Sequence, residues 1–202
     1  MRIAALGAFT ALLIVGPASR ADADTPATVP LEVRTYDQTE LTPDVREAML
    51  RVAATILAGA GVSVDWRACD AGRAAAPCPA PLGPRELALR LVRRAPEVDS
   101  ARTVTLGYAL VNTTDGSGAL ATVYVDRASQ LARRADLELS TLLGRAVAHE
   151  IGHLLLGTSA HSRDGVMRAS WSPRALLRNQ AGDWAFTARE AKLLRKAVAG
   201  RP

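Results

Sequence analysis

The stretch that decides the fold runs from His149 to Met167 and reads HEIGHLLLGTSAHSRDGVM. It contains all three histidines of the 202-residue chain, His149, His153 and His161. Residues four apart in an α-helix lie about 6 Å apart along the axis on nearly the same face, so His149 and His153 can bind one metal ion. Neutral imidazoles in this arrangement favour zinc. Glu150 points to the adjacent face, where a carboxylate can accept a proton from water instead of binding the metal.

His161 is a candidate for the third zinc ligand. In a continuous helix it would lie about 12 Å beyond His153, too far to bind the same ion. The chain must therefore leave the helix and turn back, and Gly157 can adopt the left-handed conformation that ends a helix. Two other third ligands stay open: Asp164, which is close in sequence, and Glu190, which can instead complete a capping box.

Apolar flanks predict that the motif lies on a core helix. The helical apolar pattern extends from about Leu137 to Leu156. Histidines and a glutamate on a buried helix need polar partners, and a metal ion provides them.

The rest of the chain predicts one domain, residues 24–202, without repeats or low-complexity segments. Pro43 begins a helix that Thr42 can cap and that ends at Gly59 and Gly61. A C-terminal helix is expected at 187–198, with the capping-box sequence TARE at its start. The predicted strands are 31–36, 62–66, 86–92, 104–111 and 120–125.

The beginning of the chain has the pattern of a secretory signal peptide, predicted for residues 1–23. An apolar run, 3–15, follows Met1-Arg2, and small residues place cleavage after Ala21 or Ala23. The run is shorter than the roughly 20 apolar residues that cross a bilayer. We therefore expect a secreted or periplasmic domain without a membrane span.

Export also accounts for the two cysteines. Cys69 and Cys78 enclose a short loop, CDAGRAAAPC. Cysteines this close form a disulfide in an oxidising compartment, which would stabilise the fold by about 2–3 kcal/mol. The alternative is that one thiolate binds a metal and keeps an enzyme inactive.

Composition and charge favour a globular protein and argue against a nucleic-acid-binding one. The chain is 49% hydrophobic and 22% charged, which is typical of a soluble globular protein. Its net charge of +5 comes from scattered arginines, without the basic stripe and interleaved aromatics of a nucleic-acid-binding surface. We expect a monomer with no nucleic-acid partner.

The motif resembles that of the metzincin zinc peptidases, most closely the matrixin type, whose pattern is H-E-x-x-H-x-x-G-x-x-H followed by a methionine turn. The matching residues are the segment HEIGH at 149–153, Ser162 directly after the third histidine, and Met167. The order of strands and helices before the motif is also similar. This chain departs from the pattern by one extra residue on each side of Gly157, so the third histidine comes twelve positions after the first.

The resemblance implies an α+β, zincin-like fold with a mixed β-sheet, a long active-site helix and a C-terminal helix. It implies that His149, His153 and His161 bind Zn²⁺, that Glu150 is the general base, and that Met167 forms the turn beneath the metal. Trp171, just beyond, could line a substrate pocket or simply pack.

The function that the resemblance implies is peptide-bond hydrolysis by an exported zinc-dependent peptidase, with a peptide or protein substrate. The strand at 120–125 is expected to be the edge strand along which an extended substrate pairs, through Ala121, Thr122 and Val123. A second hypothesis is a secreted zinc-binding or interaction module whose zinc has four protein ligands and no position for water. A third, a cationic protein that binds polyanions, has no motif to support it.

Overall fold

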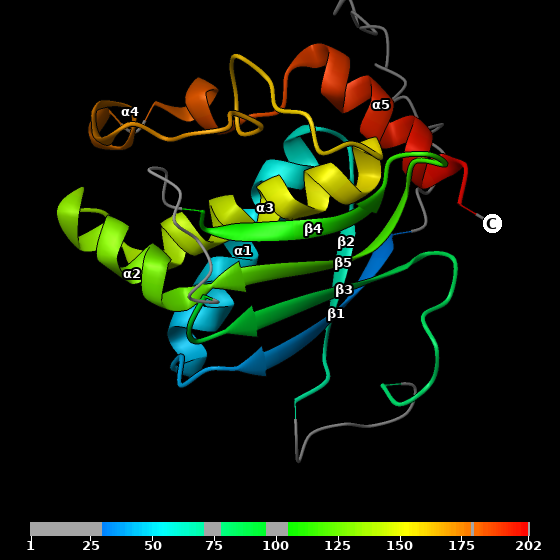
Figure 1. Cartoon of the computed structure of the whole chain (residues 1–202), viewed down its shortest axis with the longest axis horizontal. Helices are drawn as coiled ribbons and strands as arrows, with labels where there is room; N and C mark the ends of the chain where they lie inside the picture. Colours follow the sequence, from blue (N-terminus) through cyan, green and yellow to red (C-terminus); the bar gives the residue numbers. More distant parts are fainter. Residues whose placement is uncertain (1–29, 71–77, 96–104, 179, 202) are drawn as a thin grey trace, which may run out of the picture.

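A mixed β-sheet forms the frame of the described part of the chain (Figure 1). The structure is a computed structural model and describes residues 30–70, 78–95, 105–178 and 180–201, so the predicted signal peptide lies outside the described residues. The strands run in the order β2-β1-β3-β5-β4, and β4 alone of these five is antiparallel to its neighbour. They are β1 (Leu31–Gln38), β2 (Val64–Ala68), β3 (Glu86–Val92), β4 (Gly107–Asn112) and β5 (Ser117–Tyr124).

One face of the sheet is apolar because side chains alternate along each strand. In β3, Leu87, Leu89 and Leu91 are fully buried. Val33 of β1 is paired in register with Leu87, and Val123 of β5 with Leu91. A continuous apolar layer therefore crosses the middle of the sheet.

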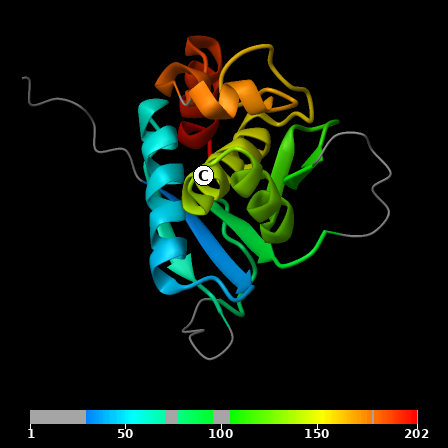
Figure 2. The same cartoon turned by 90° about the vertical axis from the view of Figure 1, so that its left-hand side faces the viewer.

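Two helices cover this apolar face, α1 (Pro43–Gly59) and α3 (Leu139–Leu156) (Figures 1 and 2). α3 contacts α1 on one side and β4 and β5 on the other. At Gly144 the two helices are so close that a Cβ would lie 2.6 Å from the backbone oxygen of Met49 and from Cβ of Val52. Every residue of α3 from 142 to 155 is buried, which confirms the predicted core helix.

The predicted N-terminal caps of α5 and α1 had different outcomes. α5 (Ala188–Ala199) begins with the predicted capping box between Thr187 and Glu190. Thr42 is the N-cap residue of α1, as expected, but its side chain makes no capping hydrogen bond. Three further elements were not predicted from the sequence: α2 (Val125–Arg134), α4 (Pro173–Arg178) and a 3₁₀ turn (Ala181–Trp184).

The expectation that residues 120–125 form the edge strand is wrong. Ala121, Thr122 and Val123 lie in β5, which pairs with β3 on one side and β4 on the other. These three side chains are buried, as an interior strand requires, whereas Leu110 of β4 is 54% exposed. β4 is the edge because its short hairpin connection places it on the outer side of β5.

A disulfide and a buried ion pair lie at the ends of the connection between β2 and β3. Cys69 and Cys78 form the predicted disulfide, with their Cα atoms 5.6 Å apart, so neither thiolate is free to bind a metal. Arg34 of β1 pairs with Glu86 and donates to the backbone oxygen of Ala80 at 2.7 Å. Within the described residues, we find no helix with the length and apolarity needed to cross a membrane.

Replacing Gly144 with alanine is expected to lower the free energy of unfolding by about 1–3 kcal/mol, because the extra carbon must fit into a packed core. Gly59→Ala is the matched control, since nothing lies within 4 Å of a Cβ there. It should leave stability unchanged or raise it by up to about 1 kcal/mol. Urea unfolding followed by circular dichroism measures both variants, and equal stabilities would contradict the close approach of α1 and α3.

Candidate metal centre

The imidazoles of His149, His153 and His161 converge on one point. Nε2 of His153 lies 3.0 Å from Nε2 of His149 and 3.3 Å from Nε2 of His161. The candidate ligand atoms all lie within 4.8 Å of one another. Nitrogens bound tetrahedrally to zinc at about 2.0–2.1 Å are about 3.3 Å apart. The structure therefore brings the predicted third histidine to the two that α3 carries, at distances that suit one zinc ion.

Gly157 makes this convergence possible. It ends α3 in the left-handed conformation, with φ 63° and ψ 33°. A Cβ at Gly157 would lie 2.6 Å from the backbone oxygen of Gly116, so the β4–β5 hairpin packs directly against the end of the helix. The chain then turns back, and the lengthened loop still delivers His161 to the site.

Backbone oxygens orient the two helical histidines. Nδ1 of His149 lies 2.8 Å from the carbonyl oxygen of Val166, and Nδ1 of His153 lies 2.8 Å from that of Thr158. A carbonyl only accepts hydrogen bonds, so each Nδ1 carries the proton and each Nε2 keeps its lone pair. Lone pairs that face each other at 3.0 Å repel, and a cation between them removes the repulsion. The donor set therefore fits Zn²⁺.

Burial keeps these imidazoles in the form that binds metal. It lowers the pKa of His149 to about 4, and it also lowers the pKa values of His153 and His161. Zinc binds the neutral imidazole, so no proton has to be displaced from these ligands at neutral pH.

Glu150 lies in the same cleft but outside the cluster of ligand atoms. Its side chain is buried, and burial raises its pKa to about 8. A Cβ at Gly107 of β4 would lie 2.9 Å from Oε1 of Glu150, so glycine at this position leaves room for the carboxylate beside the edge strand. Gly107 was not predicted as a site residue. A glycine inside a predicted strand often marks a place where another group comes close to the backbone, and this is the signal that could have identified it.

Met167 packs against the motif helix, and Trp171 contacts His149. Met167 is fully buried against α3, and its Sδ lies 2.6 Å from the position of a Cβ on Gly152. Trp171 lies edge-to-face on the His149 ring, with 5.8 Å between ring centres, and lines the cleft. Trp171 also packs against the apolar core, so it lines the cleft and packs at the same time.

The alternative third ligands do not reach the cluster. Asp164 is exposed. Glu190 is buried, but its carboxylate accepts hydrogen bonds from the backbone N–H of Thr187, at 2.7 Å, and from the hydroxyl of Ser162. Among the described residues the cluster thus offers three protein ligands for one metal ion, and all three line the cleft. Catalytic zinc sites have this arrangement, whereas structural sites are closed by four protein ligands.

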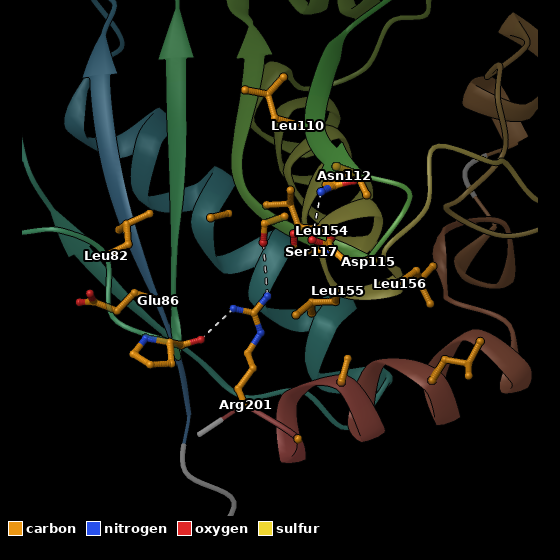
Figure 3. A pocket seen from close by; sticks show the side chains of 18 of the residues that line it. Leu82, Glu86, Leu110, Asn112, Asp115, Ser117, Leu154, Leu155, Leu156 and Arg201 are labelled. Carbon is orange, nitrogen blue, oxygen red and sulfur yellow. Dashed lines mark hydrogen bonds between the residues drawn. The ribbon is translucent and has the colours of Figure 1, made fainter.

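The cleft has a volume of about 760 Å³, and its walls come from α2, α3, β4 and the segment 159–171. A second hollow, of about 1210 Å³, lies at the C-terminal end of α3 beside Leu154 and Leu155 (Figure 3). Arg201 donates hydrogen bonds there to the backbone oxygens of Pro84 and Gly118. None of the three histidines lines this hollow, and neither does Glu150, so the smaller cleft is where the chemistry is possible.

Comparison with known proteins identifies the fold. No protein-family profile and no curated protein matches the sequence. The crystal structure of an archaemetzincin from Methanopyrus kandleri matches with a TM-score of 0.55 and 19% identity, over 87% of this chain and 99% of that one. A zinc-dependent peptidase from Methanocorpusculum labreanum matches with a TM-score of 0.51 and 15% identity, over 80% of this chain and 99% of that one. The predicted zincin-like α+β fold is confirmed.

The purified protein is expected to bind one zinc ion. His161→Ala should weaken zinc binding by more than the roughly 10–100-fold typical of losing a hydrogen-bond partner of a ligand. Asp164→Ala should leave it unchanged, because Asp164 lies outside the cluster. Competition with a chromophoric chelator at pH 7.5 measures all three affinities, and equal values for wild type and His161→Ala would exclude His161 as a ligand.

The metal-free protein should reveal the buried Glu150 in its pH dependence. Its pKa rises from 4.5 in the unfolded chain to about 8 when folded, so the stabilisation by its proton is complete below pH 4.5 and is lost as pH rises through 8. Glu150→Gln lacks this titration. Relative to wild type it should therefore gain stability between pH 4.5 and 8, by on the order of a few kcal/mol.

Thermal unfolding with a chelator present, at pH 5 and at pH 8.5, measures this gain. The burial of the histidines affects both proteins alike and cancels in the comparison. A difference between the two proteins that does not change with pH would contradict the buried, protonated carboxyl.

Proposed function

We propose that this chain is an exported, zinc-dependent peptidase of metzincin type. The observation that supports this best is the set of three Nε2 atoms around one point with Glu150 beside it in the same cleft. The similarity to an archaemetzincin and to a zinc-dependent peptidase lends further support, although at 15–19% identity it concerns the fold.

A zinc ion held by His149, His153 and His161 would lower the pKa of a water molecule and polarise the carbonyl of a peptide bond. Glu150 accepts one proton as the water oxygen adds to the carbonyl carbon. The same carboxyl then returns this proton to the departing amine nitrogen as the C–N bond breaks.

The edge strand suited to bind the substrate is β4 rather than β5. Its outer edge pairs with no other strand in the described residues, so its backbone groups can bind an extended peptide. Gly107 lies beside Glu150, and Tyr108 and Ala109 also line the cleft. A peptide paired with this part of β4 would lie in the same cleft as the histidines.

Met167 favours the metzincin type in particular. It is buried beneath the motif helix, and the preceding residue, Val166, supplies the carbonyl that orients His149. This position supports the proposal that Met167 forms a methionine turn, after a loop that is one residue longer on each side of Gly157.

Export from the cytoplasm and a monomeric state complete the proposal. The signal-peptide pattern of residues 1–23 and the Cys69–Cys78 disulfide both suit an oxidising compartment outside the cytoplasm. The second candidate, a module that binds zinc without cleaving peptides, is less favoured because no fourth protein ligand joins the three histidines in the described residues.

Glu150→Gln is expected to lower kcat/KM for peptide cleavage by about 10²–10⁴-fold, the usual contribution of a general base. Zinc content should stay at the wild-type value, because Glu150 is not a ligand. Glu138→Gln, at the exposed start of the same helix, is the matched control and should keep full activity. Unchanged cleavage by a zinc-loaded Glu150→Gln protein would exclude the proposed mechanism.

A further inference from the structure

The cleft contains an arginine side chain, Arg134, that has no part in the chemistry proposed above. Three charged side chains line the cleft beside the histidines: Glu150, Arg134 and Arg168. Arg168 is engaged, because it donates to the backbone oxygens of Gly165 and Asp183 at 3.1 and 3.2 Å and lies 4.0 Å from the Asp183 carboxylate. Arg134, by contrast, forms no ion pair with any residue that the structure describes.

Arg134 lies where a substrate side chain can reach it. It is the last residue of α2, which packs against α3 (Figure 1). Its neighbours in the lining are apolar, Leu131 and Ala135 at the end of α2 and Ala146 on α3; we call these four residues the α2–α3 pocket. Ala146 precedes Glu150 by one helical turn, about 6 Å. This distance is about two residues of an extended peptide, so a residue next to the cleaved bond can place its side chain here.

The helix end alone gives a reason for an arginine, because a cation is favourable at a helix C-terminus. Arg133 shares this reason, since it lies in the same last turn and is equally exposed. Arg133 does not line the cleft, however, and Arg134 does. The two adjacent arginines therefore separate a role in helix stability from a role in the cleft.

We propose that Arg134 selects substrates that carry a carboxylate side chain, glutamate or aspartate, next to the cleaved bond. This rests on the proposed peptidase function and specifies its substrate class. A guanidinium and a carboxylate form charge-assisted hydrogen bonds, which are about twice as strong as those between neutral groups. The two alanines leave space for the side chain, and lysine at the same position would meet a like charge.

The test compares peptides that differ only at the residues flanking the cleaved bond, where they carry glutamate, glutamine or lysine. The zinc-loaded wild type is expected to cleave the glutamate peptide at least tenfold more efficiently, in kcat/KM, than the lysine peptide. Arg134→Glu should reverse this order, and Arg134→Gln should remove most of the preference. Arg133→Glu, which makes the same change of charge outside the cleft, should keep the wild-type order.

A binding measurement gives a second readout that does not depend on turnover. In the Glu150→Gln background, the glutamate peptide should bind at least tenfold more tightly than the lysine peptide by fluorescence anisotropy, and adding Arg134→Glu should invert this. Circular dichroism checks that each variant is folded.

Cleavage of all three peptides within a threefold range by the wild type would overturn the inference and leave the peptidase function standing. Equal shifts for Arg133→Glu and Arg134→Glu would also overturn it, because net charge alone would then set the preference. If the zinc-loaded wild type cleaves no peptide, the proposed function fails, and this inference fails with it.

Discussion

The burial of α3 on all sides is the constraint on which the rest of the structure depends. This helix lies between α1 and the sheet, and it takes two histidines and a glutamate into the core. Buried polar groups are costly without partners. Carbonyls of Val166 and Thr158 satisfy one nitrogen of each imidazole, and the second nitrogens are left facing one another. A cation bound at this point would therefore stabilise the buried imidazoles by coordinating their second nitrogens.

Close backbone approach builds the rest of the site. Gly107 makes room for the Glu150 carboxylate beside the edge strand, and Gly152 makes room for the Met167 sulfur beneath the motif. Gly157 does the same for the hairpin tip at Gly116 while it turns the chain toward His161. In each case a missing side chain lets a separate element come near α3, so the parts of the site are held by the core and do not depend on loop contacts alone.

The sequence pattern predicted the elements that are determined by interactions between residues close together in the chain. The five strands, the motif helix and the capped helix α5 follow from alternation, helical period and end signals. Helix geometry pairs His149 with His153, whereas the choice of His161 over Asp164 and Glu190 rests on the resemblance to the metzincin motif. α2 was missed because its buried face consists of Val125, Ala128 and Ala132, and alanines give only a weak apolar period. The edge strand was misplaced because strand order is decided by pairing between segments far apart in sequence. Gly107 and Arg134 belong to the cleft for the same non-local reason.

The ring contact between Trp171 and His149 has a practical consequence. The indole lies against one of the three clustered histidines and also against Trp184, with 5.2 Å between the two indole ring centres. Emission from this pair depends on the charge and electron density of the adjacent imidazole. Quenching or a spectral shift of the intrinsic tryptophan fluorescence should therefore report the binding of an ion without any added dye.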